Sequence, residues 1–243
     1  MLIAQLSDIH AAPDNDNLTR LQKAIDWLIA LHPDLLVVTG DLTDDGWREG
    51  YLAMAAQLQR LPCRSLLLPG NADDKAIMCE SLPTLAHRSA KEALHFYELI
   101  DGLPVIGVDV TVAGESRGDI APHLAWLETA LLATPRPAMV FLHQHLFPSG
   151  IVPLDNAMCD GGQDFAQLLT RLPHPPLVLS CGHVHRAMSA TFAGIPAYIC
   201  GSICPANPLM LNETHVPPVT DPLSLMVHEI RPTERVSHFI SVC

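Results

Sequence analysis

The sequence predicts an α/β fold with parallel strands. The first observation is the order of its apolar segments, because short apolar strands alternate with helical patterns over the first 68 residues. The expected strands span 2–6, 34–39 and 64–68. One helix is expected to begin at Asn17, which would cap it, and a second is expected to span 47–61. This strand–helix order implies parallel strands joined by crossovers. The second observation is that each strand ends in polar residues.

The rest of the chain continues the same fold. Asp101-Gly102 is a strong tight-turn signal between two apolar strands, so it predicts a hairpin. Further helices are expected over 122–132 and 163–172, and another from about Lys75, with Asp73 and Asp74 as its expected caps. The expected strands cover 95–100, 105–110, 138–142, 177–180, 197–200, 223–229 and 235–242. No linker separates a second domain, so we expect one domain over residues 1–243.

Composition excludes several classes of protein. The net charge of −12 and the lack of a basic stretch argue against nucleic-acid binding. No apolar run reaches the roughly 18 residues that a membrane helix needs, and the N-terminus lacks a secretory signal. The seven cysteines form no CxxC pair, which favours free thiols in a reducing compartment. We therefore expect a cytoplasmic protein with no membrane or nucleic-acid partner.

Possible metal ligands follow the predicted strands. The residues in question are Asp8, His10, Asp41, Asn71, His143, His183 and His185. In open α/β sheets, ligands bind at the carboxyl ends of the strands. Residues two apart on an extended segment point the same way, so Asp8 with His10, and His183 with His185, are expected to converge. Taken singly, most of these residues are better explained as turn, cap or core residues. Five such groups in order are better explained by a shared site.

The ligand types predict a transition-metal centre. Carboxylate, amide and imidazole ligands together suit Zn, Mn or Fe better than Ca. Seven ligands exceed the needs of one ion, and a carboxylate such as Asp41 can bridge two ions. Gly40, Gly70 and Gly182 allow sharp turns and a close approach of the chain to the ions.

The ordered motifs identify a family. DIH at 8–10, GD at 40–41, GN at 70–71, His143 and GHVH at 182–185 together resemble the calcineurin-like metallophosphoesterases. The segments MLIAQLSDIH and LLLPGNADDKAIM are similar to the bacterial class III cyclic-nucleotide phosphodiesterases and the related glycerophosphodiesterases. The resemblance implies a four-layer αββα sandwich of two mixed sheets, with the site at the edge where the sheets meet.

The resemblance also implies roles for the ligands. Asp8, His10 and His185 would hold the first divalent ion, and Asn71, His143 and His183 the second. Asp41 would bridge them, and Asp41, Asn71 and His143 would take part in catalysis. A hydroxide bridging the ions would attack phosphorus in line with the leaving alkoxide. Asn71 and His145 are the expected substrate contacts.

One position departs from the family pattern. The family usually has His directly after the Asn of the GN motif, where it contacts phosphate and is a candidate acid for the leaving group. This chain has Ala72 there. His145 and Asp73 are two possible substitutes, and the sequence does not choose between them.

The remaining polar residues are assigned structural or surface roles. Asp44 and Asp45 are expected to be solvated loop residues, and Cys200 and Cys204 to be free core thiols. Seven histidines lack partners at ligand spacing: His87, His95, His123, His174, His215, His228 and His238. Loops over 112–122, 146–162 and 203–222 are expected to set specificity.

The sequence therefore predicts a phosphodiesterase with two ions of Mn, Fe or Zn, acting on a cyclic nucleotide or a glycerophosphodiester. The alternatives are a phosphomonoesterase of the same fold and, because of Ala72, a weakly active metal-binding regulatory protein. A homodimer or larger homo-oligomer is expected, with a contribution from the C-terminal region.

Overall fold

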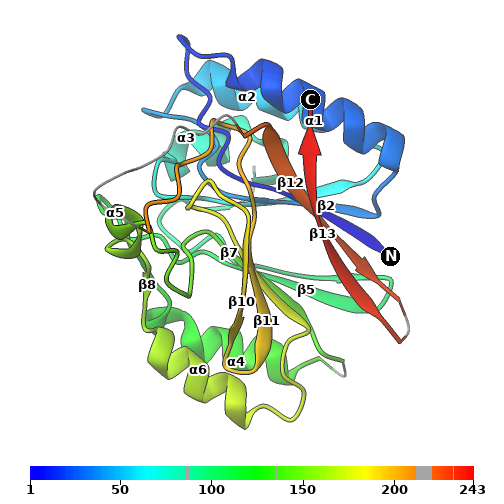
Figure 1. The fold of residues 1–243 in the computed structure, drawn as a ribbon, viewed down its shortest axis with the longest axis vertical. Coiled ribbons are helices and arrows are strands. Elements are labelled where there is room, and N and C mark those ends of the chain that lie inside the picture. Colours follow the sequence, from blue (N-terminus) through cyan, green and yellow to red (C-terminus); the bar gives the residue numbers. More distant parts are fainter. Residues whose placement is uncertain (86–87, 135, 212–220, 232) are drawn as a thin grey trace.

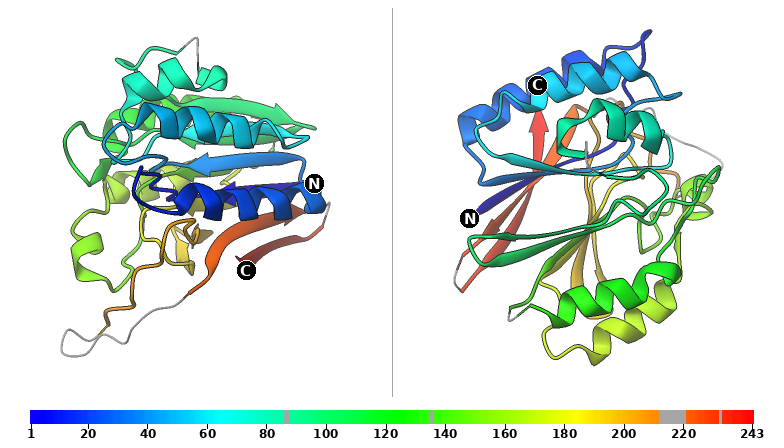
Figure 2. Two further views of the ribbon diagram at one scale, coloured as in Figure 1. Left: turned by 90° about the horizontal axis from the view of Figure 1, so that it is seen from above. Right: turned by 180° about the vertical axis from the view of Figure 1, so that it is seen from behind.

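Two β-sheets pack face to face between two layers of helices (Figures 1 and 2). The computed structural model describes residues 1–85, 88–134, 136–211, 221–231 and 233–243. Helices α1 (Asn17–Leu31), α2 (Arg48–Leu58) and α3 (Lys75–Ser81) cover one outer face, and α4 (Leu124–Leu132) and α6 (Gly162–Arg171) cover the other. The predicted four-layer αββα sandwich of two mixed sheets is confirmed.

The first sheet has five strands in the order β13-β12-β1-β2-β3. Its strands are β1 (Leu2–Leu6), β2 (Leu35–Thr39), β3 (Arg64–Leu68), β12 (Leu223–Ile230) and β13 (Arg235–Val242). Strands β1, β2 and β3 are parallel, and β12 and β13 are antiparallel additions. The predicted βαβαβ unit is therefore correct.

The second sheet has six strands in the order β10-β11-β9-β7-β5-β4. Its strands are β4 (Phe96–Ile100), β5 (Leu103–Val108), β7 (Met139–Leu142), β9 (Val178–Cys181), β10 (Met188–Phe192) and β11 (Ile195–Ile199). The predicted hairpin is the antiparallel pair β4–β5, and β5, β7, β9 and β11 run parallel. A small pair, β6 (Gly118–Asp119) with β8 (Cys159–Asp160), and the short helix α5 (Val152–Asp155) lie in the connections.

Alternation along the strands explains the layers. In β2, Leu35 and Val37 face the second sheet and pack among its residues, whereas Leu36 and Val38 pack under the helices. All four side chains are fully buried, because both faces of the sheet are covered. The parallel strands of both sheets end at one edge of the sandwich, and the predicted ligands lie in the loops that follow these strands.

Some local predictions need correction. Asn17 is the first residue of α1 rather than its cap, and Asp16 occupies the cap position without a side-chain hydrogen bond. Asp74 does cap α3, accepting from the N–H groups of Ala76 and Ile77. Strand β10 was not predicted from the sequence. His87, His215 and the predicted loop residues 212–220 lie outside the described residues.

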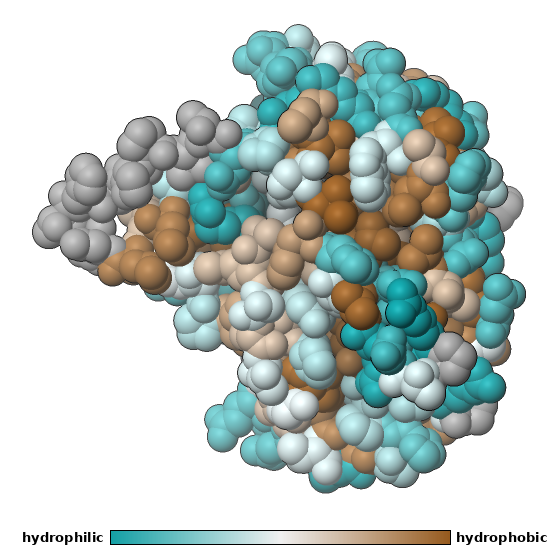
Figure 3. Space-filling model, turned by 45° about the vertical axis from the view of Figure 1, so that its right-hand side comes forward, coloured by the Kyte–Doolittle hydropathy of each residue, from teal (hydrophilic) through white to brown (hydrophobic). Residues whose placement is uncertain are grey.

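In the described residues, no helix has both the length and the apolar character to cross a membrane. On the face in Figure 3, apolar residues form brown patches between teal polar ones. Val236 and Phe239 are exposed on β13, which is an edge strand. The sequence analysis expects the C-terminal region, which contains these residues, to contribute to a homo-oligomer. Oligomerisation stays a prediction.

Candidate metal centre

The predicted ligands gather at the carboxyl ends of the parallel strands in two groups. Among the described residues, two sets of predicted ligands have donor atoms that all lie within 4.8 Å of one another: Asp8, His10, Asp41 and His185, and Asp41, His143 and His183. A third set joins His10 and His185 with Cys204. In the first set, Nε2 of His10 is 3.1 Å from Nε2 of His185, which is 3.4 Å from Oδ1 of Asp8. The ligands predicted from β1, β2, β7 and β9 therefore come together.

Asp41 belongs to both groups. Its Oδ2 lies 3.2 Å from Nε2 of His10 and 3.2 Å from Nε2 of His143. The same nitrogen of His143 is 3.2 Å from Oδ1 of Asn71 and 3.3 Å from Nδ1 of His183. One carboxylate oxygen thus stands between two clusters of ligand atoms, and Asn71 completes the second cluster.

Five of these residues adopt left-handed backbone conformations. Asp8, His10, Asp41, His183 and His185 have φ between 48° and 72°. Side-chain-bearing residues adopt this region at a cost of order 1–3 kcal/mol each, and such residues concentrate at functional sites. The prediction that Asp8 and His10 converge because the segment is extended was therefore wrong in its reason. Asp8 and His10 converge where each backbone turns at the ligand itself. The prediction that His183 and His185 converge on one point was wrong, because they belong to different sets of donor atoms.

The three glycines predicted to allow close approach do so in different ways. Gly40 has a φ of +90°, whereas a Cβ on Gly70 would lie 2.2 Å from Oδ1 of Asp41. A Cβ on Gly182 would lie 1.9 Å from Oγ of Ser7 and 2.9 Å from Oδ2 of Asp8. Only hydrogen fits at these two positions, because Asp41 fills the space at Gly70, and Ser7 together with Asp8 fills it at Gly182.

The imidazole tautomers fit a metal. Nδ1 of His10 is 2.6 Å from Oδ1 of Asp44, and Nδ1 of His143 is 2.6 Å from the carbonyl oxygen of Thr39. Both acceptors hold a proton on Nδ1, so in the neutral imidazole the unprotonated nitrogen is Nε2, which faces the cluster and can bind a metal. His183 faces the cluster through Nδ1, which is 3.3 Å from Nε2 of His143. These residues therefore have the ligand chemistry that divalent ions need.

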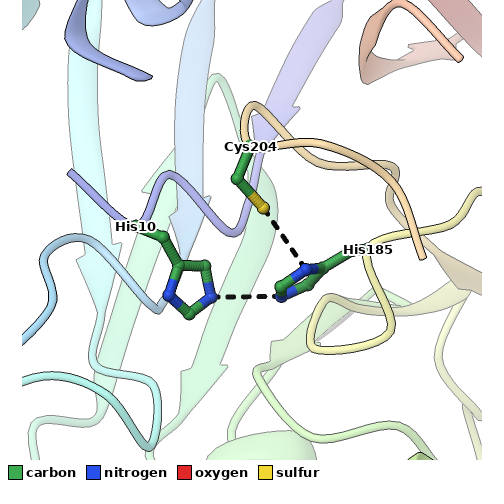
Figure 4. Close-up of side chains that lie close together, drawn as sticks. All are labelled: His10, His185 and Cys204. Carbon is green, nitrogen blue, oxygen red and sulfur yellow. Dashed lines mark hydrogen bonds between the residues drawn. The ribbon is translucent and has the colours of Figure 1, made fainter. Parts of the chain in front are cut away.

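His185 has an outer partner as well. Its Nδ1 is 3.3 Å from Sγ of Cys204, while its Nε2 faces His10 (Figure 4). Sγ of Cys204 is also 3.6 Å from the carbonyl oxygen of Pro205, to which the thiol donates. Cys204 is a free core thiol, as predicted, but its contact with His185 and the contact of Asp44 with His10 were missed. Their position in space beside His185 and His10 is the only signal that identifies them.

The electrostatics of the centre are those of tightly paired opposite charges. Burial disfavours the charged form of His10, but the hydrogen bond and charge of Asp41 outweigh it and raise the pKa of His10 to about 10. Burial has the same sign at His143, and Asp41 raises the pKa of His143 to about 9. Burial and the charge of His143 lower the pKa of His183 to about 3. Burial favours the neutral form of Asp41, yet His143 and His10 hold its pKa well below the usual range.

The two substitutes considered for the missing His are both engaged elsewhere. Oδ1 of Asp73 accepts from the N–H of Leu42 and the hydroxyl of Tyr51, and its Oδ2 accepts from the N–H of Gly70. Burial and the charge of Asp41 raise the pKa of Asp73 to about 6. The carboxylate of Asp73 thus holds the backbone loops together.

His145 is fully buried. Its ring stacks on His183 at 5.5 Å between centroids, and its Nε2 is 3.4 Å from Oδ1 of Asp155. The side chain lies behind a ligand rather than at an open surface. This placement argues against the substrate contact that the sequence suggests for His145 and favours a role in supporting His183.

Comparison with known proteins agrees with this geometry. A family model described as calcineurin-like phosphoesterase matches residues 1–187. The glycerophosphodiester phosphodiesterase GpdQ of Enterobacter lignolyticus is 30% identical over 217 residues, covering 82% of this chain and 78% of that protein. A cAMP/cGMP dual specificity phosphodiesterase of Mycobacterium tuberculosis is 31% identical over 258 residues, covering 96% and 78%. A dimetal phosphatase from Danio rerio shares the fold, with a TM-score of 0.73 at 13% identity and coverage of 100% and 99%.

Proposed function

Because the chain belongs to the calcineurin-like phosphoesterase family of metal-dependent hydrolases, we propose that it hydrolyses small phosphodiesters at a centre of two divalent ions. The observation that carries the proposal is the position of Asp41, whose Oδ2 is 3.2 Å from both His10 and His143. A carboxylate shared in this way is what a two-ion site requires.

The residues divide into two sets around Asp41. Asp8, His10 and His185 would hold one ion, and Asn71, His143 and His183 the other, with Mn, Fe and Zn as the ions that suit these ligands. When bound, the ions supply Lewis-acid chemistry: they neutralise phosphate charge and acidify a water nucleophile. The diester would therefore be attacked in line without a phosphorylated enzyme side chain.

The protein groups orient the substrate. Oδ1 of Asn71 faces His143. The NH₂ group at the other end of the planar amide therefore points away from His143 and can donate to a phosphate oxygen. The backbone N–H of Ala72 donates to Asp41, and its methyl group has no acidic proton to give to a leaving group. With Asp73 and His145 also engaged, the leaving group receives no side-chain proton from these positions. We therefore propose the fastest turnover on diesters with acidic leaving groups.

The relatives favour a diester over a monoester substrate, since they include both a glycerophosphodiester phosphodiesterase and a cyclic-nucleotide phosphodiesterase. Ala72 is the one feature that favours a weakly active regulatory protein as the second candidate. All seven cysteines are free thiols, which supports the cytoplasm as its compartment.

A direct assay separates these functions. The manganese-loaded protein is incubated with bis(p-nitrophenyl) phosphate and, separately, with p-nitrophenyl phosphate. Hydrolysis of the diester at the higher kcat/KM supports the proposal, and preference for the monoester makes the protein a phosphomonoesterase. Hydrolysis of neither by a protein that binds metal supports the regulatory role. Asp41→Asn, which weakens the shared ligand, is expected to abolish any metal-dependent turnover.

A further inference from the structure

A cavity with several charged side chains in its wall opens beside Asn71. It has a volume of about 570 Å³, which is within the range of small-molecule sites. Asn71 lies in its wall, so the cavity adjoins the candidate metal centre. The same wall includes Lys75, Asp109, Thr111 and His123. None of these four residues is a predicted metal ligand.

Asp109 anchors one side of the cavity. Its carboxylate is almost fully buried, and Oδ2 accepts from Nζ of Lys75 at 2.6 Å and from the N–H of Leu94 at 2.8 Å. Oδ1 accepts from the N–H and the hydroxyl of Thr111. All four acceptor positions of Asp109 are thereby filled. Among the described residues, Nζ of Lys75 has no other hydrogen-bond partner, so this fixed ammonium group keeps two N–H donors for a ligand.

The backbone of Asp109 organises a second donor. Its N–H donates to Nδ1 of His95 at 2.9 Å, and Nε2 of His95 is 3.2 Å from Nδ1 of His123. Burial lowers the pKa of His95 to about 4 and lowers the pKa of His123, so both rings are neutral at pH 7. A neutral His95 that accepts on Nδ1 carries its proton on Nε2 and donates to His123. His123 then carries its own proton on Nε2 as a hydrogen-bond donor, and its side chain lines the cavity.

The lining also determines which chemistry fits. Carboxylates of Asp74 and Glu92 add hydrogen-bond acceptors to the donors of Lys75, Lys91 and His123. Among the described lining residues there is no Phe, Tyr or Trp, so the imidazole of His123 is the one aromatic ring in this wall on which a base could stack. Neighbouring donors and acceptors match hydroxyl groups, which act as both.

We propose that this cavity is a subsite for the hydroxylated, non-aromatic alcohol portion of the phosphodiester, such as a glyceryl group, with Lys75 and His123 as the specificity-determining donors. The inference rests on the proposed function of the adjoining centre. It assigns a role to His95 and His123, which the sequence suggests are structural or surface residues. Asp109 is the positioning residue that holds both donors in place.

Two esters that differ only in hydroxyl groups test the subsite. The manganese-loaded enzyme is assayed with glyceryl p-nitrophenyl phosphate and with ethyl p-nitrophenyl phosphate. His123→Phe keeps a ring of similar size but has no N–H, so it is expected to lower kcat/KM for the glyceryl ester about tenfold, as expected for one lost hydrogen bond. The value for the ethyl ester is expected to stay within about twofold. His174→Phe, the same substitution at an exposed position, is the matched control and should change neither value.

A binding measurement separates this inference from the proposed function. Dissociation constants for glycerol 3-phosphate and ethyl phosphate are measured by calorimetry on the metal-loaded wild type and on Lys75→Gln. The subsite predicts tighter binding of glycerol 3-phosphate by the wild type and a ratio reduced about tenfold or more in Lys75→Gln. If the wild type hydrolyses neither ester, the proposed function fails, and the binding ratio still decides the subsite. Equal affinity of the wild type for the two phosphates, or equal losses for both esters in His123→Phe, would overturn it.

Discussion

The backbone N–H of Ala72 donates a 2.8 Å hydrogen bond to Oδ1 of Asp41. The other oxygen of Asp41, Oδ2, lies between His10 and His143. Position 72 thus helps to orient the shared carboxylate through its backbone, independently of the side chain. A substitution there should change the chemistry offered to the substrate without displacing Asp41.

Ala72→His is accordingly expected to raise turnover of diesters with alkyl leaving groups. General acid catalysis contributes about 10²–10⁴-fold, and a side chain not supported by its surroundings should recover about tenfold or more. Turnover of bis(p-nitrophenyl) phosphate, whose leaving group needs no proton, should change little. Steady-state kinetics on an alkyl diester and on this aryl diester give the comparison. An unchanged kcat/KM on the alkyl diester would show that no acid is missing.

Gly70→Ala should disrupt the centre. The added Cβ would meet Oδ1 of Asp41 at 2.2 Å, so the carboxylate has to move away from the ligands it joins. We expect metal affinity to fall at least about tenfold and the free energy of unfolding to fall by about 1–3 kcal/mol, as in other overpacked sites. Metal titration and urea unfolding measure the two effects.

Gly162→Ala is the matched control for that substitution. Gly162 is in α6, where a Cβ would have its nearest neighbour, in Phe192, at 3.9 Å. Alanine is the better helix former by up to about 1 kcal/mol, so this variant should keep its metal affinity and lose no stability. Metal affinity that falls equally in both variants would refute the steric account of Gly70.

Metal binding should release protons. The raised pKa values of His10, about 10, and His143, about 9, mean that both are protonated at pH 7 in the metal-free protein. Each must lose its proton to become a ligand, so about two protons should leave near pH 7 and metal affinity should rise with pH up to about 9–10. Calorimetry in buffers with different ionisation enthalpies counts the protons. Binding that releases none would contradict the charge state described for these imidazoles.

The metal-free protein should respond to pH with the opposite sign. A raised folded-state pKa stabilises the fold fully below the unfolded value near 6.5, and this contribution is lost as pH rises through the folded value. For His10 and His143 the loss therefore falls between about pH 6.5 and 10. Urea unfolding across this range, with and without Mn, should show a decrease for the metal-free protein only. A decrease of the same size in the metal-loaded protein would count against the assignment.

Cys204 is expected to act through His185. The 3.3 Å contact and the bond to Pro205 indicate that Sγ of Cys204 accepts the Nδ1 proton of His185. Nε2 of His185 then stays free to bind the metal. Cys204→Val removes the acceptor and should weaken metal binding about 10–100-fold, the effect seen when outer partners of ligands are lost. Cys204→Ser keeps an acceptor and should stay within about threefold. Competition binding with a metal indicator measures both, and equal losses would indicate a packing role only.

Much of the fold follows from local patterns. The strands β1 and β3 match the predicted ranges, because short apolar runs between helical patterns leave few alternatives. The residues that gather at the candidate centre could also be picked out, since each lies within four residues of the end of a parallel strand. β10 was missed because its residues alternate between intermediate and exposed, which leaves only a weak apolar signal in the sequence.

The outer partners could not be predicted. Asp44 with His10, and Cys204 with His185, are pairs separated by 34 and 19 positions, and they meet only after the loops fold. The left-handed backbones at Asp8 and Asp41 are equally invisible, since non-glycine residues there run against local preference. Sequence motifs identify the ligands, whereas tertiary packing sets their orientation.

Anomalous diffraction from crystals grown with Mn tests the central claim most directly. Two peaks are expected about 3.5–4 Å apart, with Asp41 between them, His10 and His185 at one and His143 and His183 at the other. A single peak, or two peaks without Asp41 in common, would contradict a two-ion centre built on that carboxylate.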